Sequence, residues 1–257
     1  MLRSVPVILV GIPVPGLFNT YLAVPSVCIE VSVSVRRGRE CRLESPHLDD
    51  ELRNLVEEFL RVLCRLRGDA IDVRIGLRNA VPRQLPVLGM YVALTNAILA
   101  RVLGVYGHDL AKAARHVVEY VDSTIVEDLD PGAIMALRCA DALLRPCIAR
   151  GLEYIEARSP RLSFGFEVRE RMEASYRIIS AVSRELLSLI LKLESLLVRE
   201  ALEAMSEGNH CKLQEILDFA SALESRIAGI KASGRTMPTH RRGVVEVGQI
   251  WVEHGRS

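Results

Sequence analysis

Residues 72–103 constrain the fold of this chain more than any other part of the sequence. Polar and apolar residues alternate up to Leu77, which predicts a strand. Prolines and a glycine mark a turn over residues 82–89, and small apolar residues then predict a helix over residues 90–103. This order puts the unpaired N–H groups of a helix N-terminus beside a loop, an arrangement that binds phosphate in many proteins. The loop itself is unusually poor in glycine and serine.

The composition is that of an ordinary globular protein. The 257 residues are 49% hydrophobic and 25% charged, enough to bury a core in one large domain or two small lobes. The net charge of +1 argues against a main role on nucleic acid or on a membrane surface. No lysine precedes Lys112, so a phosphate contact in the first lobe would use arginine or backbone N–H groups.

The start of the chain and its cysteines indicate a soluble cytoplasmic protein. Prolines at positions 6, 13 and 15 interrupt the first apolar run, unlike a signal peptide, and no apolar stretch is long enough to span a membrane. The six cysteines are scattered without a C-x-x-C pair. In a chain of this length we expect them to be buried thiols in a reducing compartment rather than disulfides.

The order of predicted elements favours an α+β protein with two lobes. Strands are predicted over residues 5–10, 27–35, 70–77 and 244–252, and residues 40–43 can return as a short paired strand. Helices are predicted over residues 49–65, 107–121 and 212–227, from Asp130 onward, and from the three- and four-residue apolar spacing within 167–205. The polar stretch 151–166 is the best candidate for a connection between lobes 1–155 and 156–257.

Four segments resemble the motifs of the GHMP small-molecule kinases, in the same order. They are Val14-Pro15-Gly16 for the opening Ala-Pro-Gly, residues 82–99 for the Gly-Leu-Gly-Ser-Ser loop and its helix, His116-Val-Val-Glu119 followed by Asp128 and Asp130, and residues 201–217 followed by the glycine-containing loop 229–234. The spacing of His116, Glu119, Thr124 and Asp128 is most similar to archaeal pantoate kinases. The layout covers nearly the whole chain.

This resemblance implies a two-lobe fold, with a mixed sheet and helices in the N-terminal lobe and a helix-rich C-terminal lobe. It also implies an ATP- and Mg²⁺-dependent kinase that phosphorylates the hydroxyl of a small organic acid such as pantoate. Asp128 or Asp130 would activate or orient the hydroxyl, and Glu119 would bind the metal. The implied nucleotide-binding residues are Leu85, Pro86, Val87, Leu88 and Gly89 in the first loop, and Ser233, Gly234 and Arg235 in the last.

The phosphate loop departs from the family pattern at its central positions. Two of its glycines fall on Pro86 and Leu88, and its serines fall on Gly89 and Met90. Proline removes an N–H donor, and methionine cannot bind a hard cation. These losses support an alternative, a catalytically inactive GHMP-fold protein with a binding or regulatory role. A cleft filled by Met90 and Tyr91 would favour that alternative, and an open cleft lined by Glu119 and acidic residues would favour the kinase.

Several candidate residues also have a purely structural explanation. Asp130 precedes Pro131 as a good helix N-cap, and an asparagine there would cap equally well. Glu119 lies one helical turn after His116, so the two could form a solvated pair. Tyr91 and Tyr106 would pack in the core or stack on adenine. The leucines of residues 186–197 would fill the core, or form a homodimer if exposed. Arg235, Arg241 and Arg242, with His240, suit a phosphate or a solvated loop.

Overall fold

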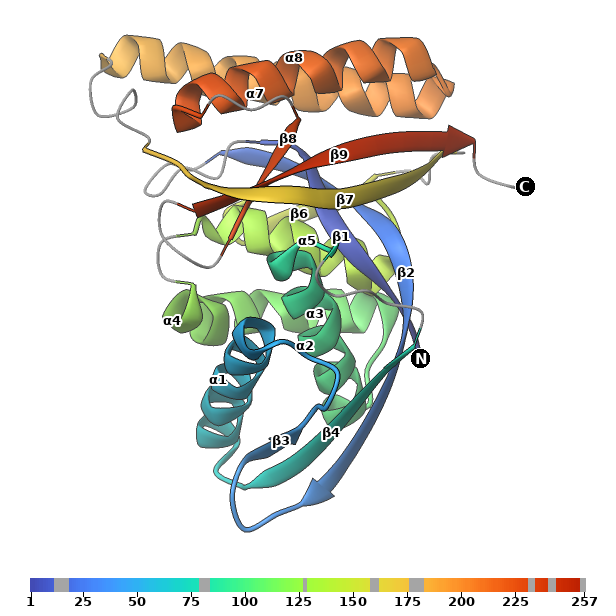
Figure 1. The fold of residues 1–257 in the computed structure, drawn as a ribbon, viewed down its shortest axis with the longest axis vertical. Coiled ribbons are helices and arrows are strands. Elements are labelled where there is room, and N and C mark those ends of the chain that lie inside the picture. The colour runs from blue at the N-terminus through green and yellow to red at the C-terminus, as the bar shows by residue number, and fades with distance from the viewer. Residues whose placement is uncertain are drawn as a thin grey trace.

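A computed structural model gives the fold. It describes residues 1–11, 19–78, 84–126, 129–157, 162–175, 183–230, 234–239 and 244–254. Within them the chain forms a six-stranded mixed sheet, a three-stranded antiparallel sheet and two groups of helices. Figure 1 shows the smaller sheet between the last two helices and the first lobe.

The long strand β2 (Thr20–Arg37) organises the larger sheet. It pairs antiparallel with β1 (Leu2–Val10), β4 (Ile71–Arg78) and β5 (Cys147–Arg150). The next strand, β6 (Glu153–Glu156), pairs antiparallel with β5. The short strand β3 (Arg42–Glu44) does not return along β2 but pairs in parallel with β4. The strands predicted from alternation are therefore present, and β2 is much longer than the alternating part of its sequence.

Some helices of the first lobe begin or end at local signals in the sequence, whereas the helix predicted over residues 107–121 is divided into an α-helix, a π-helical turn and a second, short α-helix. Their bounds are α1 (Asp50–Arg67), α2 (Val87–Leu103), α3 (Gly107–Val117), the π-helical turn η2 (Val118–Asp122), α4 (Ser123–Ile125) and α5 (Pro131–Leu143). The Asp49 carboxylate accepts a hydrogen bond from the Leu52 N–H, and Gly68 ends the helix in the left-handed region. Asp130 caps α5 as predicted.

The second lobe combines a small sheet with a helical hairpin. Its strands are β7 (Leu162–Glu173), β8 (Arg235–Pro238) and β9 (Val244–His254), in the order β7–β9–β8. Helices α7 (Arg184–Glu207) and α8 (His210–Ala228) lie side by side above it (Figure 1). Gly208 ends α7 and the Asn209 side chain caps α8, as the sequence indicates.

Two sequence-based expectations about this region are wrong. Residues 167–173 belong to strand β7, not to the helix predicted within 167–205, because they pair with β9 on both sides of a register shift between Val168 and Glu170. The stretch 151–166 is not one irregular connection, since it contains β6 and the start of β7. The chain passes from the larger to the smaller sheet between Glu156 and Leu162.

The expectation of six reduced thiols is also wrong. Cys41 is bonded to Cys64, and Cys139 is bonded to Cys147, whereas Cys28 and Cys211 are free. Each bridge joins residues of two different elements or their flanks. The fold brings these cysteines together from positions 23 and 8 residues apart, where no sequence motif announces a pair.

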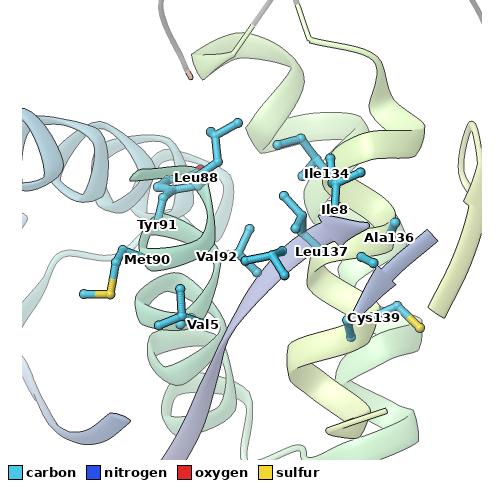
Figure 2. Close-up of a cluster of buried hydrophobic side chains, with 14 of the residues drawn as sticks. Val5, Ile8, Leu88, Met90, Tyr91, Val92, Ile134, Ala136, Leu137 and Cys139 are labelled. Atoms are coloured by element: carbon cyan, nitrogen blue, oxygen red, sulfur yellow. The ribbon is translucent and has the colours of Figure 1, made fainter. Parts of the chain in front are cut away.

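Helix α2 forms the centre of the core. It is buried from Val87 through Ala100, and Figure 2 shows Val5 and Ile8 of β1 between the side chains of α2 and α5. Met90 and Tyr91 are fully buried in this cluster. Among the described residues, no single helix has the length and apolar composition to cross a membrane, although α2 and residues 107–125 pass that test as a pair bent by 108°.

Candidate functional site

The N-terminus of α2, where the sequence predicted a phosphate site, carries a carboxylate from the protein itself. The Val87 N–H donates a hydrogen bond of 3.0 Å to Oε2 of Glu246. Glu246 comes from β9, 159 residues further along the chain, and is 0% exposed. A negative group at this position interacts favourably with the unpaired N–H groups and the dipole of the helix.

A guanidinium completes the arrangement around Glu246. Arg171 of β7 donates from Nε to Oε1 of Glu246 at 3.1 Å, and its Nη2 lies 3.0 Å from the same oxygen. Arg171 also pairs with Glu51 of α1, so it links both lobes. Burial raises the pKa of Glu246 to about 7, although the Val87 N–H and Arg171 oppose that rise. Sequence reasoning missed this residue, because one glutamate in an alternating strand carries no signal.

The predicted loop residues are packed rather than open to a ligand. Leu85, Pro86, Val87 and Leu88 are buried, and Pro86 occupies the N-cap position, where it has no N–H to donate. Gly89 serves helix packing, because a Cβ there would lie 2.5 Å from the Pro6 carbonyl oxygen of β1. Its missing side chain lets α2 approach the sheet.

Asp130 is buried and fully used by the fold. Its Oδ1 accepts from the Gly132 N–H at 2.7 Å, and its Oδ2 accepts from the Asn19 N–H at 3.1 Å and from the Tyr21 hydroxyl at 2.9 Å. Burial raises the pKa of Asp130, and the three hydrogen bonds oppose that rise. The carboxyl therefore connects the start of α5 to the start of β2.

Of the other predicted catalytic and metal residues, the structure describes only Glu119. Asp128 and Ser233 lie outside the described residues, as do Val14-Pro15-Gly16, His240, Arg241 and Arg242. Glu119 is exposed on η2, near His116, whose ring stacks on Tyr120. Within the described part of the chain, no group of three or more His, Cys, Asp and Glu side chains is placed to hold a metal ion.

Arg235 lies in a buried ionic cluster between the lobes. It is 1% exposed, its Nη1 is 2.7 Å from Oε1 of Glu224 on α8, and its Nε donates to the Ile8 carbonyl at 3.4 Å. Burial and the charge of Glu224 raise the pKa of Glu194 on α7, and the charge of Arg235 opposes that rise. Gly234 beside it packs directly on the Gly248 carbonyl of β9. The predicted last loop thus supplies a structural arginine.

Tyr91 belongs to a second buried network and does not face a cleft. Its hydroxyl donates to Oδ1 of Asp122 at 2.7 Å, and the same carboxylate receives two hydrogen bonds from Arg138. Arg138 also binds Asn96 and lies over the Phe59 and Tyr91 rings. Packing, as predicted, is the role of Tyr91, whereas Tyr106 is 58% exposed.

The fold of this chain is similar to that of several solved structures. No protein-family model and no curated protein matches the sequence. The fold is similar to Methanococcus jannaschii mevalonate kinase, with a TM-score of 0.59 and 10% identity over 98% of this chain and 97% of that one. It is also similar to L. major mevalonate kinase in complex with R-mevalonate, with a TM-score of 0.59 and 13% identity over 88% and 74%.

A third similar structure is the Streptococcus pneumoniae phosphomevalonate kinase in complex with phosphomevalonate and AMPPNP. Its TM-score is 0.58, with 13% identity over 88% of this chain and 80% of that one. At such low identity the likeness concerns the fold alone, and it extends over both lobes. The chain has the α+β fold of the GHMP small-molecule kinases.

Proposed function

We propose that this protein is a small-molecule-binding member of the GHMP-kinase fold that does not bind nucleotide at α2. One observation carries the proposal. Glu246 already accepts the hydrogen bond that the first N–H of α2 would give to a phosphate. The alternative drawn from the departures in the loop, a binding or regulatory protein, therefore has the stronger support.

The physical cost of placing a phosphate there supports this choice. An incoming phosphate would have to displace a fully buried carboxylate and separate it from Arg171. The Arg171 side chain is 42% exposed, so the main cost is the loss of the hydrogen bonds that the buried carboxyl of Glu246 makes. Pro86 and the buried Leu85 offer no replacement donors or hydroxyl groups. The residues present do not fit the triphosphate of ATP at this position.

Titration calorimetry with ATP and Mg²⁺ tests the proposal. We expect no binding to the wild-type protein at 5 mM ligand. Glu246→Ala frees the Val87 N–H and the Arg171 guanidinium, so this variant should gain millimolar affinity for inorganic phosphate. Glu51→Ala is the matched control, since it removes the other acidic partner of Arg171 without opening the helix end. Submillimolar ATP binding by the wild type would overturn the proposal.

A second candidate function is ATP-dependent phosphorylation of the hydroxyl of a small organic acid, with pantoate as the substrate by resemblance and mevalonate by fold. Asp130 favours it, because this aspartate is buried, has a raised pKa and lies where the first lobe starts its last helix. In this candidate Asp130 or Asp128 orients the hydroxyl and Glu119 holds Mg²⁺. Glu119, however, is exposed on η2.

An assay of ADP release separates the two candidates. The acceptors are pantoate, mevalonate and phosphomevalonate, each with ATP and Mg²⁺. The kinase predicts turnover that falls at least a hundredfold in Asp130→Asn, the usual loss for a positioned acid–base group. The binding protein predicts no turnover with any of the three acceptors.

A further inference from the structure

A groove along the β5–β6 hairpin has the dimensions of a ligand site. Its volume is about 660 Å³, within the range of small-molecule pockets. The β5–β6 hairpin supplies most of its wall, and Thr20 of β2 and two residues of α3 supply the rest. The lining residues used below are Thr20, Lys112, Arg115, Arg150, Tyr154 and Ile155.

The groove gathers positive charge that the protein itself does not neutralise. Arg115 and Arg150 make no ion pair with any residue that the structure describes, and Lys112 only approaches Asp109 of its own helix at 3.8 Å. Arg145, near the same hairpin, does pair with Glu156. Against these three cations the lining contains one acid, Glu153. Two guanidinium groups with free donors suit a carboxylate or a phosphate ester, which they bind through paired hydrogen bonds.

The same groove exposes apolar surface. Ile155 is 69% exposed although it lies within strand β6, and the partly buried Ile148, Leu152 and Tyr154 lie beside it. A ligand with a short apolar segment would cover this surface and lose contact with water there. An inorganic anion would leave it uncovered. The lining therefore favours an organic anion over a simple ion.

Two lining residues of the groove are also close in sequence to the surroundings of Asp130. Thr20 follows Asn19, whose N–H donates to Asp130, and it pairs with Arg150 across the β2–β5 ladder. The Gly132 N–H donates to Asp130, and Gly132 lies close to the backbone of Gly151. A Cβ added to Gly132 would lie 2.8 Å from the Gly151 nitrogen. Thr20 and Arg150 of the groove are thus sequence neighbours of Asn19 and Gly151, which lie against Asp130 and the start of α5.

We propose that this groove binds a small organic anion, a carboxylate or phosphate ester with a short apolar segment, held by Arg115 and Arg150. The inference deepens the proposed binding function by giving its site and ligand class. Carboxylates and phosphate esters of this kind share a pair of anionic oxygens next to an aliphatic chain. The α2 terminus takes no part, so the groove binds its ligand whether or not Glu246 is intact.

Calorimetry of the full chain at 150 mM salt tests this site with four probes: pantoate, mevalonate, phosphomevalonate and inorganic phosphate. We expect submillimolar binding of at least one organic probe and at least tenfold weaker binding of inorganic phosphate. Arg150→Gln and Arg115→Gln should each weaken the organic probe at least tenfold, the scale of one lost charged hydrogen bond. Arg101→Gln, an exposed arginine of α2 outside the groove, removes the same charge and should leave affinity unchanged.

Ile155→Ser tests the apolar contact separately from the contact between the arginines and the anionic group. It should weaken the organic probe and leave inorganic phosphate unaffected. The proposed groove site would be overturned if no organic probe bound at 10 mM, or if inorganic phosphate bound as tightly as the organic probes. It would also be overturned if Arg101→Gln and Arg150→Gln weakened binding of the organic probe equally. ATP binding by the wild type would instead overturn the closed α2 site and leave the groove result standing.

Discussion

Asp130 shows how a residue can have the predicted local role and still behave differently from the sequence-based expectation. Its N-cap bond to Gly132 is present, but its second oxygen also accepts from the Asn19 N–H and the Tyr21 hydroxyl. An asparagine has one accepting oxygen and one donating NH₂ group, so it cannot satisfy both sets of donors. The local equivalence of Asp and Asn as caps therefore does not hold here.

We predict that Asp130→Asn destabilises the fold by about 1–3 kcal/mol, the cost of leaving a buried donor unpaired. The measurement is the urea midpoint of unfolding at pH 7. Tyr21→Phe, which removes one donor and leaves both carboxyl oxygens with a partner, should cost less. An unchanged midpoint for Asp130→Asn would show that Asp130 acts only as a helix cap.

Helix α2 illustrates how one sequence pattern serves two different purposes. A proline- and glycine-marked turn before an apolar helix is typical of a phosphate-binding corner. In this protein the glycine lets the helix pack on β1, and the helix end binds Glu246. The element was predicted, but the group at its N-terminus was not, since that group belongs to the other lobe.

We predict that Gly89→Ser, which places serine where the family loop has one, lowers stability by about 1–3 kcal/mol through overpacking against Pro6 and Val5. Thermal unfolding measures the effect. Ala113→Ser adds the same hydroxyl to the partly buried face of α3 and should change stability much less. If Gly89→Ser melted normally, the close approach of α2 to β1 would not limit this position.

At the scale of the whole molecule, buried acids make stability depend on pH in an unusual direction. Burial raises the pKa values of Glu194 and Glu224 between the lobes, that of Asp141 to about 6 and that of Glu246 to about 7. The folded state therefore holds protons more tightly than the unfolded chain. The stability that these groups contribute is complete below about pH 4 and is lost as the pH rises through the folded pKa values.

We predict that the free energy of unfolding falls between pH 5 and pH 7.5, by roughly 1 kcal/mol per pH unit for each group that titrates. Glu194→Gln removes one such charge from among Glu224, Arg235, Thr236 and the Gly11 N–H. It should raise the urea midpoint at pH 7.5 and change it little at pH 5. Glu185→Gln, an exposed acid on the same helix, is the control and should not raise it. A midpoint for the wild type that rises with pH would contradict the prediction.

Local patterns by themselves predicted five of the nine strands that the structure describes, β1, β2, β3, β4 and β9, and most of the helix ends. Asp49, Asp130, Gly208 and Asn209 act within a few residues of the positions that they cap, so their effect can be read from the sequence. The resemblance to the GHMP kinases extended these predictions to the correct two-lobe fold. The limits appeared at β7, where pairing with β9 outweighed a helical spacing.

Tertiary structure alone decided what the candidate site contains. Glu246 meets Val87 across 159 residues and Asn19 meets Asp130 across 111, and the two disulfides also join cysteines that no motif pairs. The first of these contacts depends on how the two lobes fit together and the others on how elements of the first lobe pack, and periodicity within one segment carries no information about either. The sequence showed that the phosphate loop was altered. Only the folded chain showed that the buried side chain of Glu246, from a strand near the far end of the sequence, accepts a hydrogen bond from the N-terminus of α2.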